Sequence, residues 1–595
     1  MEGLEVTVLL GLAILVGTAL APRIRVATPL LLVIIGLLLG FVPQLREIQL
    51  PPETVLLLFL PVMLFWESLT TSLRAVRRSL RYIVPMSTLL VVASALAVAW
   101  VASLFGMPWP VALLLGAAVA PPDATAVAAL GRLLPQRMFM KLKAESLTND
   151  GTALVLYAIA LSLALGDSVS AWSVTLTVLV AYLGGAAAGI AVAALAYLAL
   201  RRRRPAIVIN ITLLLVPFTA FLLAELVHAS GVLAVVFAGL IVAWTLPRIT
   251  TASSRRQAMS AWPFGVYLLN GALFVLIGLE VQYVVHDIPG RMIGTLLLVT
   301  VAAWGALIVV RYLFQLLFAP FSRPAGGAPY SHNRGRIVST VAGFRGAVSL
   351  AIALSVPEAI AGTGDLSGRD AVVFVTAGVI LLSLLVQGPL LPAIVRWARM
   401  PDDGTAEDEY ELAERTISGA AIAALDDLAR EHGISDEVRD RIRREGYETL
   451  ELQNARAYAR QRRNDEAQIA ELESAFVAPD ALDTGSIRAP GSAAGDPATA
   501  AAPGARRTVM VEATAAAETS ALQMLATSSG IDLTQRSPLA RFEEMTRLKL
   551  ALLDRKRTVL MRLRREGTID DLVERRVEAH LDLEELRLRG VDQSD

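Results

Sequence analysis

Long apolar runs recur through the first two thirds of the chain, and they constrain its fold more than any other feature. A bilayer core of about 30 Å requires roughly 20 mostly apolar residues per transmembrane helix. Thirteen candidate runs are centred on residues 5–21, 28–42, 53–68, 82–105, 110–130, 145–166, 170–199, 206–228, 231–246, 264–285, 293–318, 336–356 and 371–395. A chain of 595 residues that is 55% hydrophobic and has no cysteine is not an ordinary soluble enzyme, a disordered chain or a disulfide-stapled secreted domain. The sequence therefore predicts an all-α polytopic membrane protein with about 13 transmembrane helices.

The net charge of zero conceals two oppositely charged parts. Residues 1–400 carry 27 Lys and Arg against 15 Asp and Glu, whereas residues 401–595 carry 27 against 39. We predict a transmembrane domain over 1–400 and a cytosolic helical region over 401–477, where charged residues follow helical spacing. An Ala-, Gly-, Pro- and Ser-rich stretch at 478–506 indicates a flexible linker, and 507–595 a second cytosolic helical region.

Arginine and lysine alternate between the connections of the predicted spans. One set of connections carries twenty basic residues, the other only Arg46, Arg291 and Arg369. Because basic connections face the cytoplasm, this bias places the N-terminus outside and the C-terminus inside. With an odd number of spans, two six-helix units on either side of span seven run in opposite directions. That arrangement predicts the inverted repeats of a secondary transporter.

Span five contains two prolines beside a carboxylate, in the sequence APPDAT at residues 120–125. Pro121 and Pro122 remove two backbone donors, so the helix has to break near Asp123. Broken backbone inside a bilayer is tolerated where it is buried in protein or lines a wet cavity. The freed Pro122 carbonyl and the Asp123 carboxylate are hard oxygen ligands for a cation, and Thr125 is a candidate for organising the site. A kinked helix with a snorkelling Asp123 is the structural alternative.

Span six begins with ESLTNDGTA at residues 145–153. Helical spacing places Ser146 and Asp150 on one face, so that stripe offers a hydroxyl and a carboxylate to an ion. Glu145 and Asn149 lie on the neighbouring face, where they can act as scaffolding. Alternatively, Glu145 is an ordinary acidic residue at the first turn of a helix, favoured there by the helix dipole.

Span twelve contains GFRG at residues 343–346, with an arginine between two glycines. In the inverted-repeat interpretation this span is the counterpart of span five, and Gly343 and Gly346 mark its break. A buried Arg345 cannot lose its proton and needs a partner, for which Glu145 is the candidate. Span three bends at Pro61 and ends with Glu67, which is placed equally well on an ion path or at the membrane interface near Arg74.

These segments together resemble the monovalent cation:proton antiporter-1 family, which includes NhaP-type and animal sodium/proton exchangers. The resemblance covers residues 5–400, with matching segments in the same order. It rests on FLP at 59–61 with Glu67, APPDA at 120–124, ESLTNDGTA at 145–153, AE at 224–225, SGVLAVV at 230–236, FVLIGLE at 274–280 and GFRGAVSL at 343–350. Other members have a single proline after the aspartate of span five, whereas here Pro121 and Pro122 precede it.

The resemblance implies a role for each of these positions. Asp150 would bind either the cation or the proton. Asp123, Ser146, the Pro122 carbonyl and an acidic residue like Glu67 would be further cation ligands. Asn149 would hold the broken backbone of span five, and Glu145 with Arg345 would form a buried structural ion pair.

A sodium/proton antiporter of the plasma membrane, serving pH and sodium homeostasis, is the function implied. Sodium and a proton would compete for Asp150 in an elevator or rocking cycle, and Asn149 before it implies electroneutral 1:1 exchange. A potassium/proton antiporter of the same fold and a cation channel are the alternatives. An intramembrane enzyme is disfavoured because no nucleophile–base pair is evident.

The remaining expectations concern partners. The family implies a homodimer in the lipid bilayer. The sequence indicates no cofactor, since it has no phosphate-binding loop or zinc pattern, and its acidic tail disfavours nucleic acid. The cytosolic helices suit a bundle that supports the dimer, or a regulatory domain. Opposite charges on the tail and on the basic cytoplasmic connections predict a regulatory contact between them.

Overall fold

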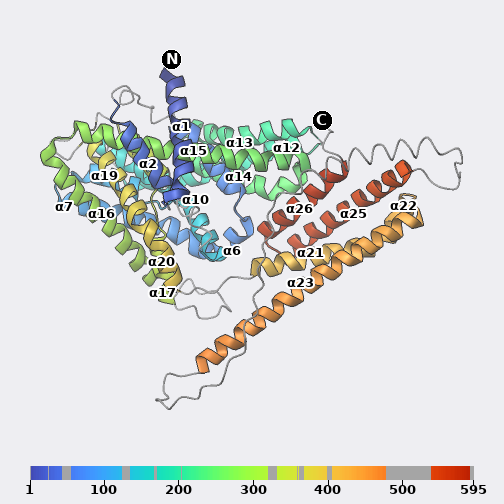
Figure 1. Ribbon diagram of the computed structural model, residues 1–595. Coiled ribbons are helices and arrows are strands. Elements are labelled where there is room, and N and C mark those ends of the chain that lie inside the picture. Colours follow the sequence, from blue (N-terminus) through green and yellow to red (C-terminus); the bar gives the residue numbers. More distant parts are fainter. Residues whose placement is uncertain are drawn as a thin grey trace, which may run out of the picture. The chain divides into compact units, whose positions relative to one another are not determined.

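Helices make up all the regular structure in the part of the chain that the computed structural model describes (Figure 1). The described residues are 2–24, 26–42, 55–123, 134–166, 170–202, 204–318, 332–357, 360, 368–398, 405–476 and 538–589. The first helices are α1 Glu2–Ile24, α2 Thr28–Leu39, η1 Val55–Phe59, α5 Leu60–Leu69, α6 Leu73–Ser87, α7 Leu89–Leu104, α8 Trp109–Val119 and α10 Gln136–Ala164. They are followed by α11 Ala171–Leu179, η3 Val180–Gly184, α12 Gly185–Leu200, α13 Ala206–Leu226, α14 Gly231–Ile249, α15 Ala252–Asp287 and α16 Gly290–Leu317.

The remaining helices complete the bundle and the C-terminal region. They are α17 His332–Val341, α18 Ala347–Leu354, α19 Arg369–Leu382, η5 Ser383–Gln387, α20 Gly388–Ala398, α21 Thr405–Ala423, α22 Leu425–Glu431, α23 Asp436–Phe476, α25 Pro538–Glu566 and α26 Asp571–Arg589. The predicted linker at 478–506 lies outside the described residues.

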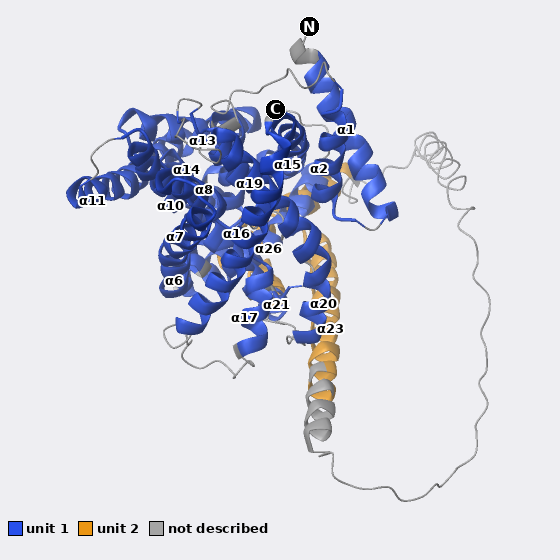
Figure 2. Cartoon of the chain, turned by 90° about the vertical axis from the view of Figure 1, so that its left-hand side faces the viewer, with its two compact units in different colours: residues 1–413, 560–595 blue, residues 414–559 orange. Residues whose placement is uncertain are grey.

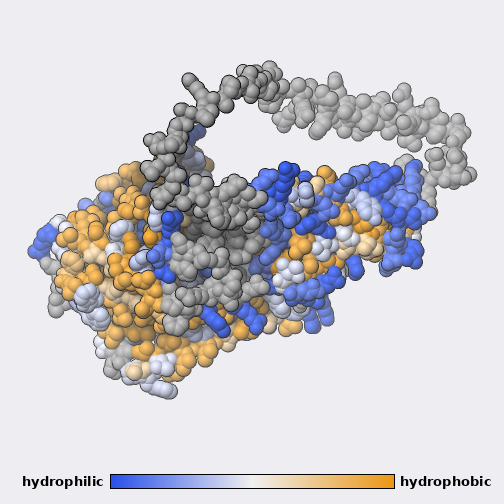
Figure 3. Space-filling model, turned by 90° about the horizontal axis from the view of Figure 1, so that it is seen from below, coloured by the Kyte–Doolittle hydropathy of each residue, from blue (hydrophilic) through white to orange (hydrophobic). Residues whose placement is uncertain are grey.

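Many of these helices have the length and composition of membrane spans. Within the described ranges, eight are at least 18 residues long and apolar enough to cross a bilayer, and four more are apolar but shorter. The predicted run at 336–356 instead contains two short helices, α17 and α18. Large apolar side chains such as Leu183, Leu226 and Leu317 are mostly exposed, and apolar residues cover a broad part of the surface visible in Figure 3. An apolar exterior of this kind suits lipid rather than water. The count of thirteen and the inverted repeats remain predictions.

Two groups of helices surround separate hydrophobic cores. We call the helices α6, α7, α8, α10, α16, α18 and α19 the α8 bundle, because they pack on α8 or on its immediate neighbours. The helices α5, α12, α13 and α14 form the α14 bundle around a second core. The long helix α15 packs on α1 and α2 and also contacts members of both bundles.

The chain divides into two compact units, shown in different colours in Figure 2. The first contains residues 1–413 together with 560–595, so the last helix, α26, belongs to the same unit as the membrane helices. The second contains residues 414–559, whose small core includes Leu425, Ile442 and Leu548. Within this second unit the Ser435 hydroxyl donates a hydrogen bond of 2.6 Å to Glu544.

Candidate functional site

Two interrupted helices meet near the middle of the α8 bundle. Helix α8 ends at Val119, one residue before the two prolines, and residues 121–123 are not helical. The second interruption, at residues 343–346, separates α17 from α18. The Asp123 N–H donates a hydrogen bond of 2.8 Å to the carbonyl of Phe344, and Arg345 Nε donates one of 2.6 Å to the carbonyl of Val119. Backbone groups that each break leaves free are therefore hydrogen-bonded by groups of the other break.

Helix α10 supplies the polar side chains that face this junction. The amide of Asn149 donates a hydrogen bond of 2.9 Å to the carbonyl of Pro122, which is the contact that the family resemblance implies. A carbonyl oxygen has two lone pairs, so the Pro122 carbonyl keeps one for another partner. Ser146 and Asp150, four residues apart, are both buried. The helix that bonds to the Pro122 carbonyl thus also carries a buried hydroxyl and a buried carboxylate one turn apart.

Three carboxylates, those of Asp150, Asp123 and Glu67, lie near enough to interact through their charges. Asp150 experiences the negative charges of both Asp123 and Glu67. A Cβ atom on Gly346 would lie 1.5 Å from Oδ2 of Asp123, so the glycine permits the close approach of this carboxylate. Among the described residues, no lysine or arginine forms an ion pair with Asp150. Like charges held together in a low-dielectric site favour the binding of a proton or a cation.

Of the predicted site residues Glu67 and Thr125, the structure describes only Glu67. Glu67 lies in the last turn of α5, close enough to Asp123 and Lys143 to interact with their charges, so α5 delivers it to the edge of the site. Thr125 lies outside the described residues. No group of three or more His, Asp and Glu among the described residues is arranged as a metal site, so a cation here would also depend on hydroxyl and carbonyl oxygens.

The expected ion pair between Glu145 and Arg345 is wrong. Glu145 pairs instead with Arg311 of α16, whose Nη1 and Nη2 donate to Oε1 at 2.6 Å and to Oε2 at 3.2 Å. Arg345 donates to the backbone carbonyls of Val119 and Gly343. Gly343 has a second role, because a Cβ there would lie 3.0 Å from the Arg311 side chain.

Arg311 is the residue that sequence reasoning missed. Helix α16 continues to Leu317 and buries Arg311. The available signal was its spacing from Gln315, four residues later on the same helix face, within an otherwise apolar run. Both side chains bond to Ser339 of α17: Arg311 Nε to its carbonyl and Gln315 to its hydroxyl. Such a buried polar pair indicates a shared partner on a neighbouring helix.

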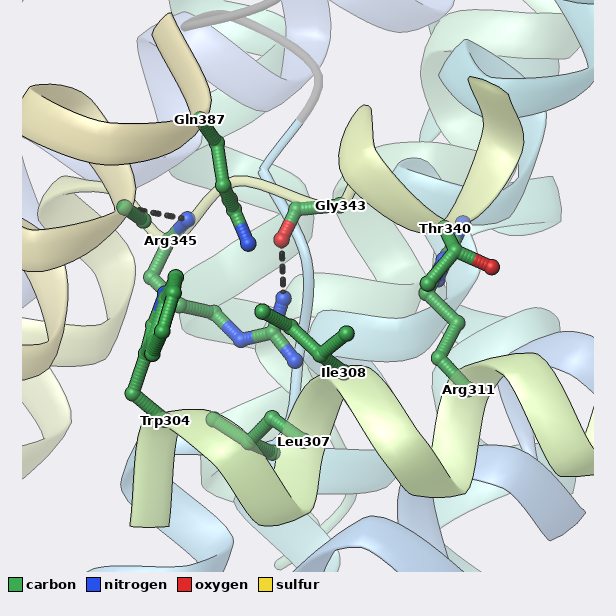
Figure 4. A pocket seen from close by; sticks show the side chains of 9 residues that line it. Trp304, Leu307, Ile308, Arg311, Thr340, Gly343, Arg345 and Gln387 are labelled. Atoms are coloured by element: carbon green, nitrogen blue, oxygen red, sulfur yellow. Dashed lines mark hydrogen bonds between the residues drawn. The ribbon is translucent and has the colours of Figure 1, made fainter. Parts of the chain in front are cut away.

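A small cavity lies beside Arg345, and Figure 4 shows Gly343, Trp304 and Gln387 around it. It is lined by two arginines and by none of the three carboxylates, so it is distinct from the candidate cation site. The indole N–H of Trp304 and Oε1 of Gln387 have no partner among the described residues. A polar cavity with unsatisfied buried groups suits ordered water.

Comparison with known proteins now decides the family. A family profile described as "Sodium/hydrogen exchanger, transmembrane" matches residues 10–397. The chain belongs to the sodium/hydrogen exchanger family. An uncharacterised Na(+)/H(+) exchanger of Mycobacterium tuberculosis is 36% identical over 98% of this chain and 96% of its own length. The Na(+)/H(+) antiporter ApNhaP of Aphanothece halophytica is 30% identical over 67% of this chain and 74% of its own.

A solved structure supports the same fold. The sodium proton antiporter MjNhaP1 from Methanocaldococcus jannaschii superposes with a TM-score of 0.52 at 19% identity, covering 67% of this chain and 99% of its own. Membership of the sodium/hydrogen exchanger family supports cation/proton antiport by a multi-pass membrane protein, rather than enzymatic catalysis. The family match ends at residue 397, whereas the mycobacterial relative also extends over the C-terminal region.

Proposed function

We propose that this protein exchanges sodium for protons across the plasma membrane, and that both ions compete for Asp150. The observation that carries the proposal is the contrast between two neighbouring carboxylates of α10. Glu145 is neutralised by Arg311, whereas Asp150 is buried beside Asp123 and Glu67 with no basic partner among the described residues. A charge left uncompensated in this way is stabilised by a bound proton or cation.

The proposed cation ligands are all oxygen atoms. They are the carboxylates of Asp150 and Asp123, the Ser146 hydroxyl, the Pro122 carbonyl and the Glu67 carboxylate. Asn149 holds the Pro122 carbonyl in place by its hydrogen bond of 2.9 Å. Hard oxygen ligands suit sodium, but potassium and lithium bind to the same chemistry, and cavity size selects among them. A potassium/proton antiporter is therefore the second candidate.

Competition for one carboxylate couples the two fluxes. Sodium and a proton cannot both neutralise Asp150 at the same time. The site therefore crosses the membrane with sodium bound in one direction and with a proton bound in the other. When the site is empty, its charge opposes movement through the membrane, which suppresses leak. Asn149 before Asp150 matches the family pattern for electroneutral exchange of one cation for one proton. The proposed cycle moves the α8 bundle relative to the α14 bundle by alternating access.

The proposed setting follows from the charge distribution and the family. The arginine-rich connections place the N-terminus outside and the C-terminal region in the cytoplasm. We assign the protein a role in sodium and pH homeostasis as a homodimer in the plasma membrane, by analogy with the family.

Proteoliposomes that contain the purified protein and an internal pH dye test the function. Sodium, potassium and lithium gradients are imposed in turn, with the membrane potential clamped or released. We expect sodium-driven proton movement that does not depend on the potential, and its loss in Asp150→Asn with unchanged folding. Glu225→Gln, at an exposed carboxylate near the end of α13, is the control and keeps the activity.

The alternatives give different results in the same assay. Full sodium-driven proton movement in Asp150→Asn contradicts the proposal. Proton movement that only potassium drives identifies the potassium antiporter. A sodium current without proton counterflow identifies a channel.

A further inference from the structure

The last helix, α26, is bound to the membrane helices by a set of buried charges. Arg255, at the first turn of α15, donates to two α26 carboxylates: from Nη2 to Glu578 at 2.9 Å and from Nε to Asp582 at 2.6 Å. Asp571, the first residue of α26, accepts from the Ser72 hydroxyl and from the Arg74 N–H, both at 3.2 Å. These contacts join α26 to two connections, one between α5 and α6 and one between α14 and α15.

The two connections lead into different bundles. Arg74 is the second residue of α6, which packs on α7 and α10 of the α8 bundle. Its Nη1 also donates to the carbonyl of Ile569 at 2.7 Å, just before α26. On the other side, Arg564 donates to the carbonyl of Trp244 in α14 at 3.3 Å. Arg564 lies in the last turn of α25 and also donates to Asp571 and Glu574, which joins the end of α25 to α26. Because these joined segments are bonded to both bundles, a displacement of one bundle against the other has to break some of the contacts.

Arg575 of α26 lies at the end of the helix that carries Glu67. It donates hydrogen bonds to the carbonyls of Leu69 and Thr71, which follow Glu67 in the chain. Lys143 of α10 donates a hydrogen bond of 2.6 Å to the hydroxyl of Thr70, between those two carbonyls. Lys143 also experiences the charges of Glu67 and Arg575. Two basic side chains therefore stand together at this end of the site.

The burial of α26 indicates firm docking. Asp571, Glu574, Glu578, Asp582 and Glu585 are all at most 8% exposed. Carboxylates are rarely buried to this degree unless they are paired, since their desolvation is costly. If α26 were only a terminal anchor, its buried carboxylates could find their basic partners on a single bundle. Docking across both bundles and against the Glu67 helix instead points to control of their relative movement.

We propose that α26 is an intramolecular latch that, when docked, holds the two bundles together and slows exchange. The latch rests on the proposed antiport function and adds a regulatory element to the same site. In the docked state, Arg575 and Lys143 repel cations at the Glu67 end of the site, and the α26 carboxylates fix Arg74 and Arg255. Undocking frees the bundles to move and removes Arg575 from this end.

Cross-linking tests the latch directly, because the chain has no cysteine to remove first. The Ser72 hydroxyl lies 3.3 Å from Oδ2 of Asp570, so Ser72→Cys with Asp570→Cys places two thiols within reach of a short, reducible bis-thiosulfonate. Sodium-driven proton movement is measured in the same proteoliposomes before cross-linking, after it and after reduction. We expect sodium-driven proton movement before cross-linking, its arrest after cross-linking and its recovery after reduction. Unchanged activity at complete cross-linking would overturn the latch, whereas inactivity before cross-linking would count against the antiport function.

Substitutions in the full-length chain give the opposite change. Arg575→Gln removes the two donors to Leu69 and Thr71, and a second variant, Glu578→Gln with Asp582→Asn, weakens the attachment to Arg255. We expect each to raise the initial exchange rate by on the order of fivefold, as a population shift toward the undocked state predicts. Arg587→Gln, at an exposed position of α26, makes the same change of charge and leaves the rate unaltered. Unchanged or lower rates in both latch variants, with normal folding, would show that α26 is only an anchor.

Discussion

Arg311 and Glu145 form a buried ion pair with two hydrogen bonds, 2.6 and 3.2 Å long, across helices α16 and α10. Their side chains are 3% and 1% exposed. Because α10 also carries Asp150, this pair fixes the helix that presents the site, and it removes one carboxylate from the set available to a cation. The pair therefore distinguishes Glu145, whose charge is neutralised, from Asp150, the proposed ion-binding carboxylate five residues later on the same helix.

Removing Arg311 should destabilise the protein more than it alters the ligands. Arg311→Ala leaves the Glu145 carboxylate buried without its partner, and breaking a buried pair in this way costs about 3–5 kcal/mol. Thermal unfolding of the purified protein, followed by tryptophan fluorescence, measures the loss. Arg311→Met combined with Glu145→Leu removes both charges and should recover much of the stability. Arg202→Ala, at an exposed arginine, is the control; a melting temperature for Arg311→Ala equal to that of the control would refute the expectation.

Asn149 should be required for transport through its contact with the broken backbone. Asn149→Ala removes the hydrogen bond to the Pro122 carbonyl, which then remains buried without a donor at a cost of about 1–3 kcal/mol. We expect the half-saturation concentration for sodium to rise by roughly fivefold to a hundredfold if this cost falls on binding, since every 1.4 kcal/mol of lost binding energy is a factor of ten. Thr148→Ala, which alters only hydrogen bonds to carbonyls of the same helix, should have little effect. Equal sodium affinity in the two variants would exclude this role for Asn149.

Gly346→Ala should disturb the site by displacing Asp123. The new Cβ would lie 1.5 Å from Oδ2 of Asp123, so the carboxylate or the backbone has to move. If Asp123 is a ligand, we expect weaker sodium activation of exchange, by about tenfold for a loss of ~1.4 kcal/mol. Gly305→Ala in α16 is the control, because a Cβ there meets no atom within 4 Å. Wild-type sodium activation in Gly346→Ala would argue against Asp123 as a ligand.

The helix breaks could be predicted from local chemistry alone. Pro121 and Pro122 cannot donate hydrogen bonds, and Gly343 and Gly346 flank a charged residue in an apolar run. The structure shows in addition that the two breaks contact each other, because the Asp123 N–H donates a hydrogen bond to the Phe344 carbonyl. That contact depends on how the helices pack, which spacing along the chain does not encode.

The choice between two arginines could not be predicted. Arg311 and Arg345 both lie in apolar runs, and both needed a partner by the same argument. The two guanidinium groups differ only in what their packing brings near. Arg311 meets the Glu145 carboxylate, while Arg345 reaches carbonyls that the breaks leave free, such as that of Val119. The sequence likewise predicted opposite charges on the tail and the basic connections, but not that Arg255 would meet Glu578 and Asp582.

Two neighbouring carboxylates of α26 should affect its docking in opposite ways. Burial raises the pKa of Asp571, but the guanidinium groups of Arg564 and Arg74 and the Arg74 N–H outweigh it and hold that pKa below its ordinary value. Burial raises the pKa of Glu574, and the nearby Arg564 only partly offsets it. Docking therefore gains from Asp571 above its ordinary pKa and loses that gain as the pH falls through the lowered value. The contribution of Glu574 is present at low pH and is lost as the pH rises through its raised pKa.

At pH 7, Asp571→Asn should consequently weaken docking and Glu574→Gln should strengthen it. We expect about 1 kcal/mol for Asp571 and a smaller gain for Glu574. Hydrogen exchange of the α26 amides in the full-length protein measures both, with faster exchange in the first variant and slower exchange in the second. Glu566→Gln, at an exposed carboxylate in the last turn of α25, serves as the control. Shifts of the same sign in both variants would show that charge alone, rather than the separate surroundings of Asp571 and Glu574, controls the docking of α26.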